Sequence, residues 1–231
     1  WNLDRIDQRR LPLDGVYRFG SAGQGVTIYS VDSGIYVDHN EYDFVDGDDM
    51  AADCDGHGTH VASTAVGRSV GVARGSRLVS VRVLDCNGSG TIADTVAGLD
   101  WVARNAKLPA IVMMSLGVPA GSWSEVLSEG VRSLVRKHGI VVVVASGNSA
   151  MDSCRVVPAN VPENKFGPGP REGQESMYQW ANTGACVDLF APGVEIFGAY
   201  RCSAITPTSY TWASGTSMAA PLVAGVAALY L

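Results

Sequence analysis

The chain has 231 residues, of which 46% are hydrophobic and 17% charged, and it contains 27 glycines and 10 prolines. This composition excludes disordered, collagen-like and coiled-coil proteins, and the length suits one domain with a substantial hydrophobic core. The net charge is −6 and no cluster of basic residues stands out, so we expect no nucleic-acid partner. Because no apolar run reaches the roughly 18 residues of a membrane span, we also expect no membrane partner.

Short runs of β-branched residues alternate with helical patterns along the chain. Four runs have the length and composition of strands: residues 26–31, 78–84, 111–116 and 140–145. Two intervals carry apolar residues at spacings of three and four, as on one face of a helix: Ile92, Val96, Leu99 and Ala103, then Leu127, Val131, Leu134 and Val135. Apolar strands separated by amphipathic helices predict a mainly parallel central sheet covered on both faces, which is a three-layer α/β/α fold.

The stretch from Asn160 to Asn182 breaks this pattern. It is polar and rich in glycine and proline, and we expect a loop there. Such a loop is long for a compact α/β domain, so we interpret the stretch as functional, mobile or anomalous.

Three short segments contain the residue types of nucleophilic acyl chemistry: residues 31–34, 55–62 and 214–221. A serine hydroxyl becomes a nucleophile when an imidazole accepts its proton, and a carboxylate then holds the imidazole in the required tautomer. Asp32 follows a strand, whereas His57 and Ser217 stand at predicted helix starts, so we predict that these three residues act together at one edge of the sheet. Asn148 and the N–H of Ser217 are candidate hydrogen-bond donors to an oxyanion.

These segments, together with residues 83–90 and 189–193, resemble those of the subtilisin-like serine proteases, most closely the proteinase K branch. The order Asp, His, Ser along the chain is also that of subtilisin. The resemblance implies a subtilisin-like fold and a serine endopeptidase with Asp32, His57 and Ser217 as its triad, Asn148 as oxyanion donor and an acyl-enzyme intermediate. It also implies polypeptide substrates, secretion, a monomer, and a pro-segment that inhibits the enzyme and assists its folding.

The same resemblance implies where a substrate binds. Two segments would line the groove that receives the residue before the scissile bond: Ser115-Leu116-Gly117 and Ala145-Ser146-Gly147. An extended substrate would pair with the first segment as an added strand. Val118 stands where the family usually has a second glycine, so we expect its side chain to crowd the substrate backbone.

Five cysteines, at positions 54, 86, 154, 186 and 202, include no C-x-x-C pair, which argues against zinc ribbons and thioredoxin-type redox chemistry. Two disulfides and one odd thiol are the simplest oxidised arrangement, but spacing leaves the connectivity open, and buried free thiols stay an alternative. By the family resemblance the pairs are Cys54 with Cys86 and Cys154 with Cys186, and Cys202 is left over. Disulfides would agree with secretion.

Two further features are weak candidates for metal binding. His60 lies three residues after His57 without the glutamate of an H-E-x-x-H motif, so we predict a structural hydrogen-bonding role for it. An acidic run that includes Asp53 and Asp55 lacks the spacing of an EF-hand, and we interpret it as a solvated loop, with structural calcium as an alternative. We expect no other cofactor.

The departures from the family pattern leave alternatives open. The chain stops at Leu231, where relatives continue, so we expect residues 1–231 to be a single catalytic domain that is incomplete at its C-terminal end and lacks its signal and pro-segment. The altered stretch after Asn160 favours a second hypothesis, a catalytically impaired fold that acts as a protein-binding module. An esterase is a weaker third hypothesis, because residues 215–219 do not form the G-x-S-x-G turn of esterase folds.

Overall fold

The structure, a computed structural model, describes residues 1–36, 41–43, 45, 50–161, 166–169, 177–200 and 209–231. At its centre lies a parallel sheet with the strand order β2-β3-β1-β4-β6. These strands are β1 (Thr27–Asp32), β2 (Glu41–Asp43), β3 (Arg77–Arg82), β4 (Ala110–Met114) and β6 (Val141–Val144). The first strand in the chain is therefore the middle strand of the sheet.

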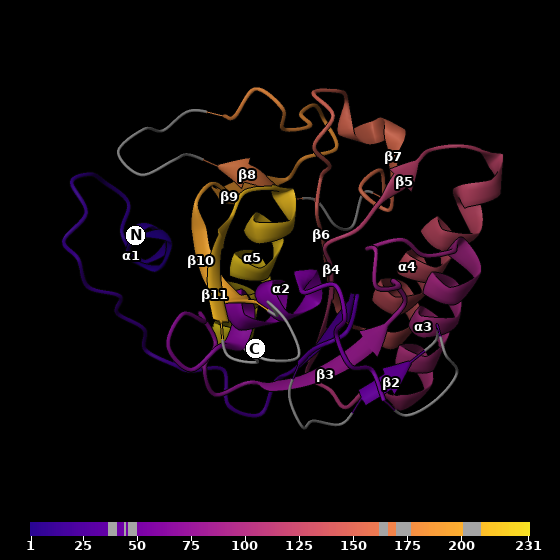
Figure 1. Ribbon diagram of the computed structural model, residues 1–231, viewed down its shortest axis with the longest axis horizontal. Coiled ribbons are helices and arrows are strands. Elements are labelled where there is room, and N and C mark those ends of the chain that lie inside the picture. The colour runs from indigo at the N-terminus through magenta and orange to yellow at the C-terminus, as the bar shows by residue number, and fades with distance from the viewer. Residues whose placement is uncertain (37–40, 44, 46–49, 162–165, 170–176, 201–208) are drawn as a thin grey trace.

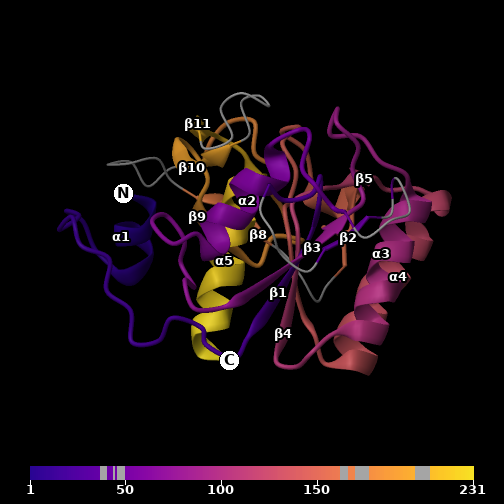
Figure 2. The ribbon, with the colours of Figure 1, turned by 60° about the horizontal axis from the view of Figure 1, so that its bottom comes forward.

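Helices cover both faces of this sheet (Figures 1 and 2). The helices α2 (His57–Val66) and α5 (Thr216–Tyr230) lie on one face, and α3 (Ile92–Asn105) and α4 (Glu125–His138) lie on the other. Successive strand residues point to opposite faces: Met113 packs in one apolar cluster with Val61 of α2, and Met114 packs in another with Leu134 of α4. The predicted three-layer α/β/α fold is thus confirmed.

The apolar pattern located the central strands and the outer helix pair. The predicted strands are β1, β3, β4 and β6, and the predicted helices are α3 and α4. Individual residues next to the helices define the helix ends. Thr91 accepts a hydrogen bond from the N–H of Asp94 at the start of α3, and Gly139 adopts a left-handed conformation, with φ of 65°, at the end of α4.

Smaller elements surround these layers in the described part of the chain. Paired strands are β5 (Val118–Pro119) with β7 (Val156–Val157), β8 (Phe166–Gly169) with β9 (Leu189–Pro192), and β10 (Ile196–Tyr200) with β11 (Ser209–Ala213). The remaining elements are the helix α1 (Asn2–Asp7) and the 3₁₀ turns η1 (Ser122–Ser124) and η2 (Ser153–Arg155).

The prediction of a loop from Asn160 to Asn182 was wrong for residues 166–169, which form β8. This strand pairs in parallel with β9, a segment some twenty residues further along the chain. Backbone pairing of this kind needs no alternation of apolar side chains, so a segment rich in glycine and proline can form it without a local signal. Residues 162–165 and 170–176 lie outside the described residues.

The helix α5 is buried between two groups of elements. Its Ala220 and Ala224 pack against the sheet, and its Leu222 packs in a separate apolar cluster with Ala191 of β9. A helix enclosed in this way is apolar around its whole circumference. Even so, none of the helices in the described ranges is both long enough and apolar enough to cross a membrane.

Candidate active site

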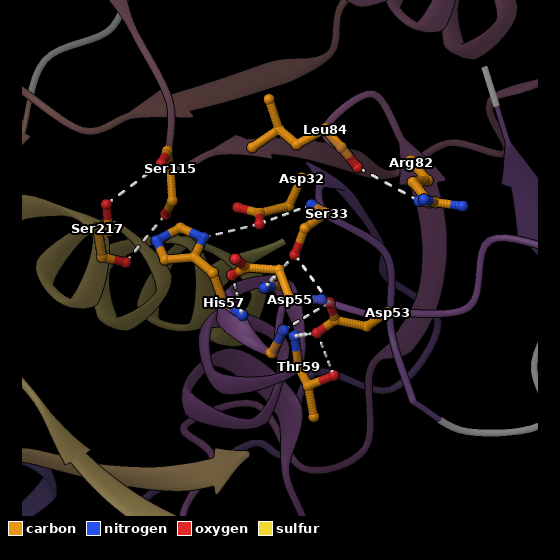
Figure 3. A network of polar contacts seen from close by, with 12 residues as sticks. Asp32, Ser33, Asp53, Asp55, His57, Thr59, Arg82, Leu84, Ser115 and Ser217 are labelled. Atoms are coloured by element: carbon orange, nitrogen blue, oxygen red, sulfur yellow. Dashed lines mark hydrogen bonds and ion pairs between the residues drawn. The ribbon is translucent and has the colours of Figure 1, made fainter. Parts of the chain in front are cut away.

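Asp32, His57 and Ser217 lie at one edge of the central sheet. Asp32 is the last residue of β1, His57 is the first residue of α2, and Ser217 is the second residue of α5. Because α2 and α5 pack on the same face of the sheet, their N-terminal ends meet beyond the carboxyl end of β1 (Figure 3). The structure thus brings together the three residues that the sequence predicted to act together.

The carboxylate of Asp32 is in direct contact with the imidazole of His57. The distance from Asp32 Oδ1 to His57 Nδ1 is 2.7 Å, and the Asp32 side chain is 1% exposed. Gly58 permits this approach, because a Cβ atom there would lie 2.1 Å from the carbonyl oxygen of Gly34 and 3.1 Å from Asp32 Oδ1. Replacement of this glycine by any other residue would therefore push α2 away from β1.

The charge of Asp32 controls the basicity of His57. The pKa of His57 is raised to about 9, mainly by the charge of Asp32 and also by the Asp32 hydrogen bond and the charges of Asp55 and Asp53, against the opposing effect of burial. A carboxylate on Nδ1 also leaves Nε2 as the ring nitrogen that can accept a proton. The His57 ring is therefore suited to act as a base through Nε2.

The hydroxyl of Ser217 lies on the other side of the imidazole from Asp32 (Figure 3). It donates a hydrogen bond to the carbonyl oxygen of Ser115 at 3.2 Å, and the hydroxyl of Ser115 donates to the carbonyl oxygen of Ser217 at 2.9 Å. The Ser217 hydroxyl is thus directed to the carbonyl of Ser115. Hydrogen bonds of catalytic groups are often loose before substrate binds.

Asn148 lies against the start of α5. Its side-chain oxygen accepts a hydrogen bond from the N–H of Thr216 at 2.9 Å, and the N–H of Gly147 donates to the Thr216 hydroxyl at 3.2 Å. These contacts use the oxygen of the exposed Asn148 side chain, so its NH₂ group is the candidate donor to a bound substrate. The N–H of Ser217, in the first turn of α5, has no carbonyl partner within its helix. The two donors together suit an oxyanion.

Cavities flank the segment from Ser115 to Gly117. One, of about 350 Å³, lies beside Ser217 and has Ala145, Gly147, Met151 and Val156 in its wall. The other, of about 410 Å³, lies beside His57 and has Leu84, Ser89 and Leu127 in its wall. Of the six residues predicted to line the substrate groove, five line the cavity beside Ser217: Ser115, Leu116, Gly117, Ala145 and Gly147. Ser146 does not, because it is fully buried behind the cavity wall.

The sequence analysis missed Asn182, which lines this cavity and supports its wall. The Asn182 side chain is fully buried; its oxygen accepts hydrogen bonds from the N–H groups of Ser149 and Met151, and its NH₂ group donates to the carbonyl of Ser146. These bonds join two segments about 35 residues apart. No local pattern could have predicted the contact, because in the sequence an asparagine after a polar stretch cannot be distinguished from an asparagine exposed on the surface.

The interpretation of the acidic run as a solvated loop was wrong for Asp53. Its side chain is 1% exposed and accepts hydrogen bonds at the start of α2. The structural role predicted for His60 is confirmed: its Nε2 lies 3.1 Å from the carbonyl oxygen of Ile196, and burial lowers its pKa. A Cβ atom at Gly198 would clash with this ring.

Both disulfides implied by the family resemblance are present, Cys54 with Cys86 and Cys154 with Cys186. The first joins the segment before α2 to the segment after β3, next to the cavity beside His57. Cys202 lies outside the described residues. Among the described residues, no group of three or more histidine, cysteine or acidic side chains is arranged to hold a metal ion.

Comparison with known proteins agrees with this geometry. A sequence model described as the subtilase family matches residues 22–231. The chain is 46% identical over 239 residues to alkaline serine exoprotease A of Vibrio alginolyticus and to an extracellular serine proteinase of a Thermus species. All of this chain is covered in both cases, against 43% and 56% of these relatives, so the chain spans about half their length. A solved structure of a cold adapted subtilisin-like serine proteinase superposes with a TM-score of 0.92 at 44% identity, covering all of this chain and 84% of that one.

Proposed function

Because this chain belongs to the subtilase family, we propose that it is a serine endopeptidase that hydrolyses peptide bonds through an acyl-enzyme intermediate. The observation that carries the proposal is the contact of 2.7 Å between Asp32 and His57, with Ser217 on the far side of the imidazole. Three residues of these types in this order provide a base, its orienting carboxylate and a nucleophile.

In the proposed first step, Ser217 Oγ attacks the carbonyl carbon of the scissile bond while its proton passes to His57 Nε2. Asp32 accepts the Nδ1–H bond and stabilises the imidazolium that forms. The negative charge on the substrate oxygen is stabilised by the N–H of Ser217 and the NH₂ group of Asn148. His57 then donates its proton to the leaving amine, and water releases the acyl group by the same steps in reverse order.

The substrate is proposed to be a polypeptide with an apolar side chain before the scissile bond. The cavity beside Ser217 has no charged residue among its described lining residues, and Met151 and Val156 give it apolar surface. An extended chain lying along Ser115–Gly117 would place that side chain in this cavity and the preceding ones beside His57. The exposed backbone of Gly117 leaves room for such pairing.

A covalent label and one variant test the proposal. A phosphonylating reagent specific for activated serines should label Ser217, and cleavage of an internal bond in a peptide should be lost in Ser217→Ala. Ser128→Ala, which removes a buried hydroxyl on α4, is the matched control and should cleave normally. Full cleavage by Ser217→Ala would refute the proposal, and binding of peptides without cleavage by the unmodified protein would favour the binding-module hypothesis instead.

We also propose that the protein is secreted, acts as a monomer and matures from a precursor whose pro-segment inhibits it. The two disulfides support secretion, since such bonds persist in oxidising compartments, and the Thermus relative is named an extracellular serine proteinase. Sedimentation of the purified protein tests whether it is a monomer. Inhibition of the protein by the pro-segment supplied in trans tests whether it matures from such a precursor.

A further inference from the structure

The first turn of α2 is held by side chains that precede or lie outside the helix. The first N–H groups of a helix have no carbonyl partners within it and need acceptors from elsewhere. Here the three N–H groups of residues 57–59 donate in turn to Asp55 Oδ1 at 3.0 Å, Ser33 Oγ at 2.9 Å and Asp53 Oδ2 at 2.8 Å. Each acceptor is therefore a side chain, and the orientation of the helix start depends on them.

Asp53 accepts more of these hydrogen bonds than any side chain near it. Its Oδ1 accepts from the N–H groups of Gly56 at 2.8 Å and Asp55 at 3.1 Å and from the Ser33 hydroxyl at 3.0 Å. Its Oδ2 accepts from both the N–H and the hydroxyl of Thr59, the latter at 2.6 Å. Gly56, at the N-cap position, has a φ of 107° and no side chain, so Asp53 takes the place of the usual capping residue.

Ser33 connects this arrangement to the carboxylate that pairs with His57. Its hydroxyl accepts from the N–H of Gly58 and donates to Asp53, and its own N–H donates to Asp32 Oδ1 at 2.7 Å. A continuous path of hydrogen bonds thus runs from Asp53 through Ser33 to the end of β1 (Figure 3). The path joins the two elements that carry Asp32 and His57.

We propose that Asp53 is a positioning residue that, through Ser33 and the first turn of α2, holds the imidazole of His57 against Asp32 and toward Ser217. The inference rests on the serine-endopeptidase function proposed above. Asp53 itself touches neither the reacting serine nor the cavities that flank it, so it acts only through its neighbours.

Asp53→Asn tests the geometry with little change in volume. An asparagine has one acceptor oxygen, and its NH₂ group must face either the N–H groups of Asp55 and Gly56 or that of Thr59. In both orientations at least one buried N–H loses its acceptor, and the first turn must shift to recover one. We expect kcat to fall roughly 10-fold to 100-fold with little change in KM, because small errors in the placement of a catalytic group cost that much.

The same substitution removes a negative charge near His57. The charged or titratable groups that act on this ring are Asp32 at the end of β1, Asp53 and Asp55 before α2, and His60 within α2, whose pKa is lowered by burial. Loss of the Asp53 charge should lower the pKa of His57, so the rise of kcat with pH should move to lower pH. Ser33→Ala breaks the path without changing the charge and should reduce kcat with a smaller shift in the pH profile.

The experiment compares Asp53→Asn, Ser33→Ala and the double variant in peptide hydrolysis, with active sites counted by phosphonylation and melting temperatures recorded. Ser124→Ala, in the turn η1 that precedes α4 on the opposite face of the sheet, removes two hydrogen bonds between its hydroxyl and the backbone of Gly121 and is the matched control. It should lower the melting temperature and leave kcat per active site unchanged. The double variant should be little worse than the poorer single variant, because both changes break one network.

The outcomes separate this inference from the function on which it rests. If Asp53→Asn and Ser33→Ala lower only stability or the number of labelled sites, with normal kcat per site and an unmoved pH profile, Asp53 is merely structural and the inference is wrong. If Ser217→Ala remains active, the proposed function itself is wrong. Should Asp53→Asn fail to fold, kcat per labelled site in Ser33→Ala decides the question alone.

Discussion

Asp32→Asn should lower catalysis more than any change that leaves His57 and Ser217 in place. The Asp32 charge is the largest cause that raises the pKa of His57 to about 9, so its removal returns that pKa toward the ordinary 6.5. At about 1.4 kcal/mol per pKa unit, the lost stabilisation of the imidazolium is about 3 kcal/mol, or roughly 10²-fold in rate. Asparagine can also hold the wrong tautomer of the ring, and the combined loss in kcat is expected to approach about 10⁴-fold.

The assay is kcat/KM for a chromogenic peptide between about pH 5 and pH 11, with active sites counted by phosphonylation. Only neutral His57 can accept the Ser217 proton, so the rate of the unmodified protein should rise with pH and level off near the raised pKa. In Asp32→Asn the plateau should be far lower and the rise should occur at lower pH. A plateau within tenfold of the unmodified protein, or a rise at unchanged pH, would show that the contact with Asp32 does not control the base.

Three further changes give separate outcomes. Gly58→Ala places a Cβ atom 2.1 Å from the carbonyl oxygen of Gly34, so both the melting temperature and phosphonylation should fall sharply. Asn148→Ala removes one candidate oxyanion donor, and kcat should fall by roughly 10²–10³-fold with KM little changed. Cys54→Ala with Cys86→Ala opens a disulfide with a sequence separation of 32, and the free energy of unfolding in urea should fall by about 3–4 kcal/mol.

Each of these changes has a control or a contrary result. Gly130→Ala, in the middle of α4, puts its Cβ atom 3.2 Å from a movable Leu99 methyl group and should preserve labelling. Equal losses of phosphonylation in Gly130→Ala and Gly58→Ala would contradict the argument that Gly58 is needed for the close approach of α2 to Gly34 and Asp32. An unchanged kcat in Asn148→Ala would show that the Asn148 amide does not stabilise the oxyanion. An unchanged urea midpoint without the disulfide would contradict the entropic estimate.

The residues of the candidate triad could be recognised before any coordinates, but their actual contacts could not. Asp32, His57 and Ser217 lie in long, distinctive segments, and strand and helix periodicity already places such residues at one sheet edge. The direction of the Ser217 hydroxyl, toward Ser115, depends on the packing of α5 beside β4. Packing also decides which of the predicted groove residues are exposed. Ser146 was predicted to line the groove but is fully buried.

By itself, the sequence determined the layers, the family and the residue types of the site, because these follow from local periodicity and from motifs contained in short segments. Only the tertiary structure showed that Asp53 is buried and that Asn182 supports the cavity wall, and only it revealed the strand β8. Asn182 and β8 take their hydrogen-bond partners from distant segments of the chain, and Asp53, which bonds mostly to residues 55–59 nearby, also bonds to Ser33 at the distant end of β1. A carboxylate or an amide is an equally good group for solvent and for a buried network until folding brings those partners to it.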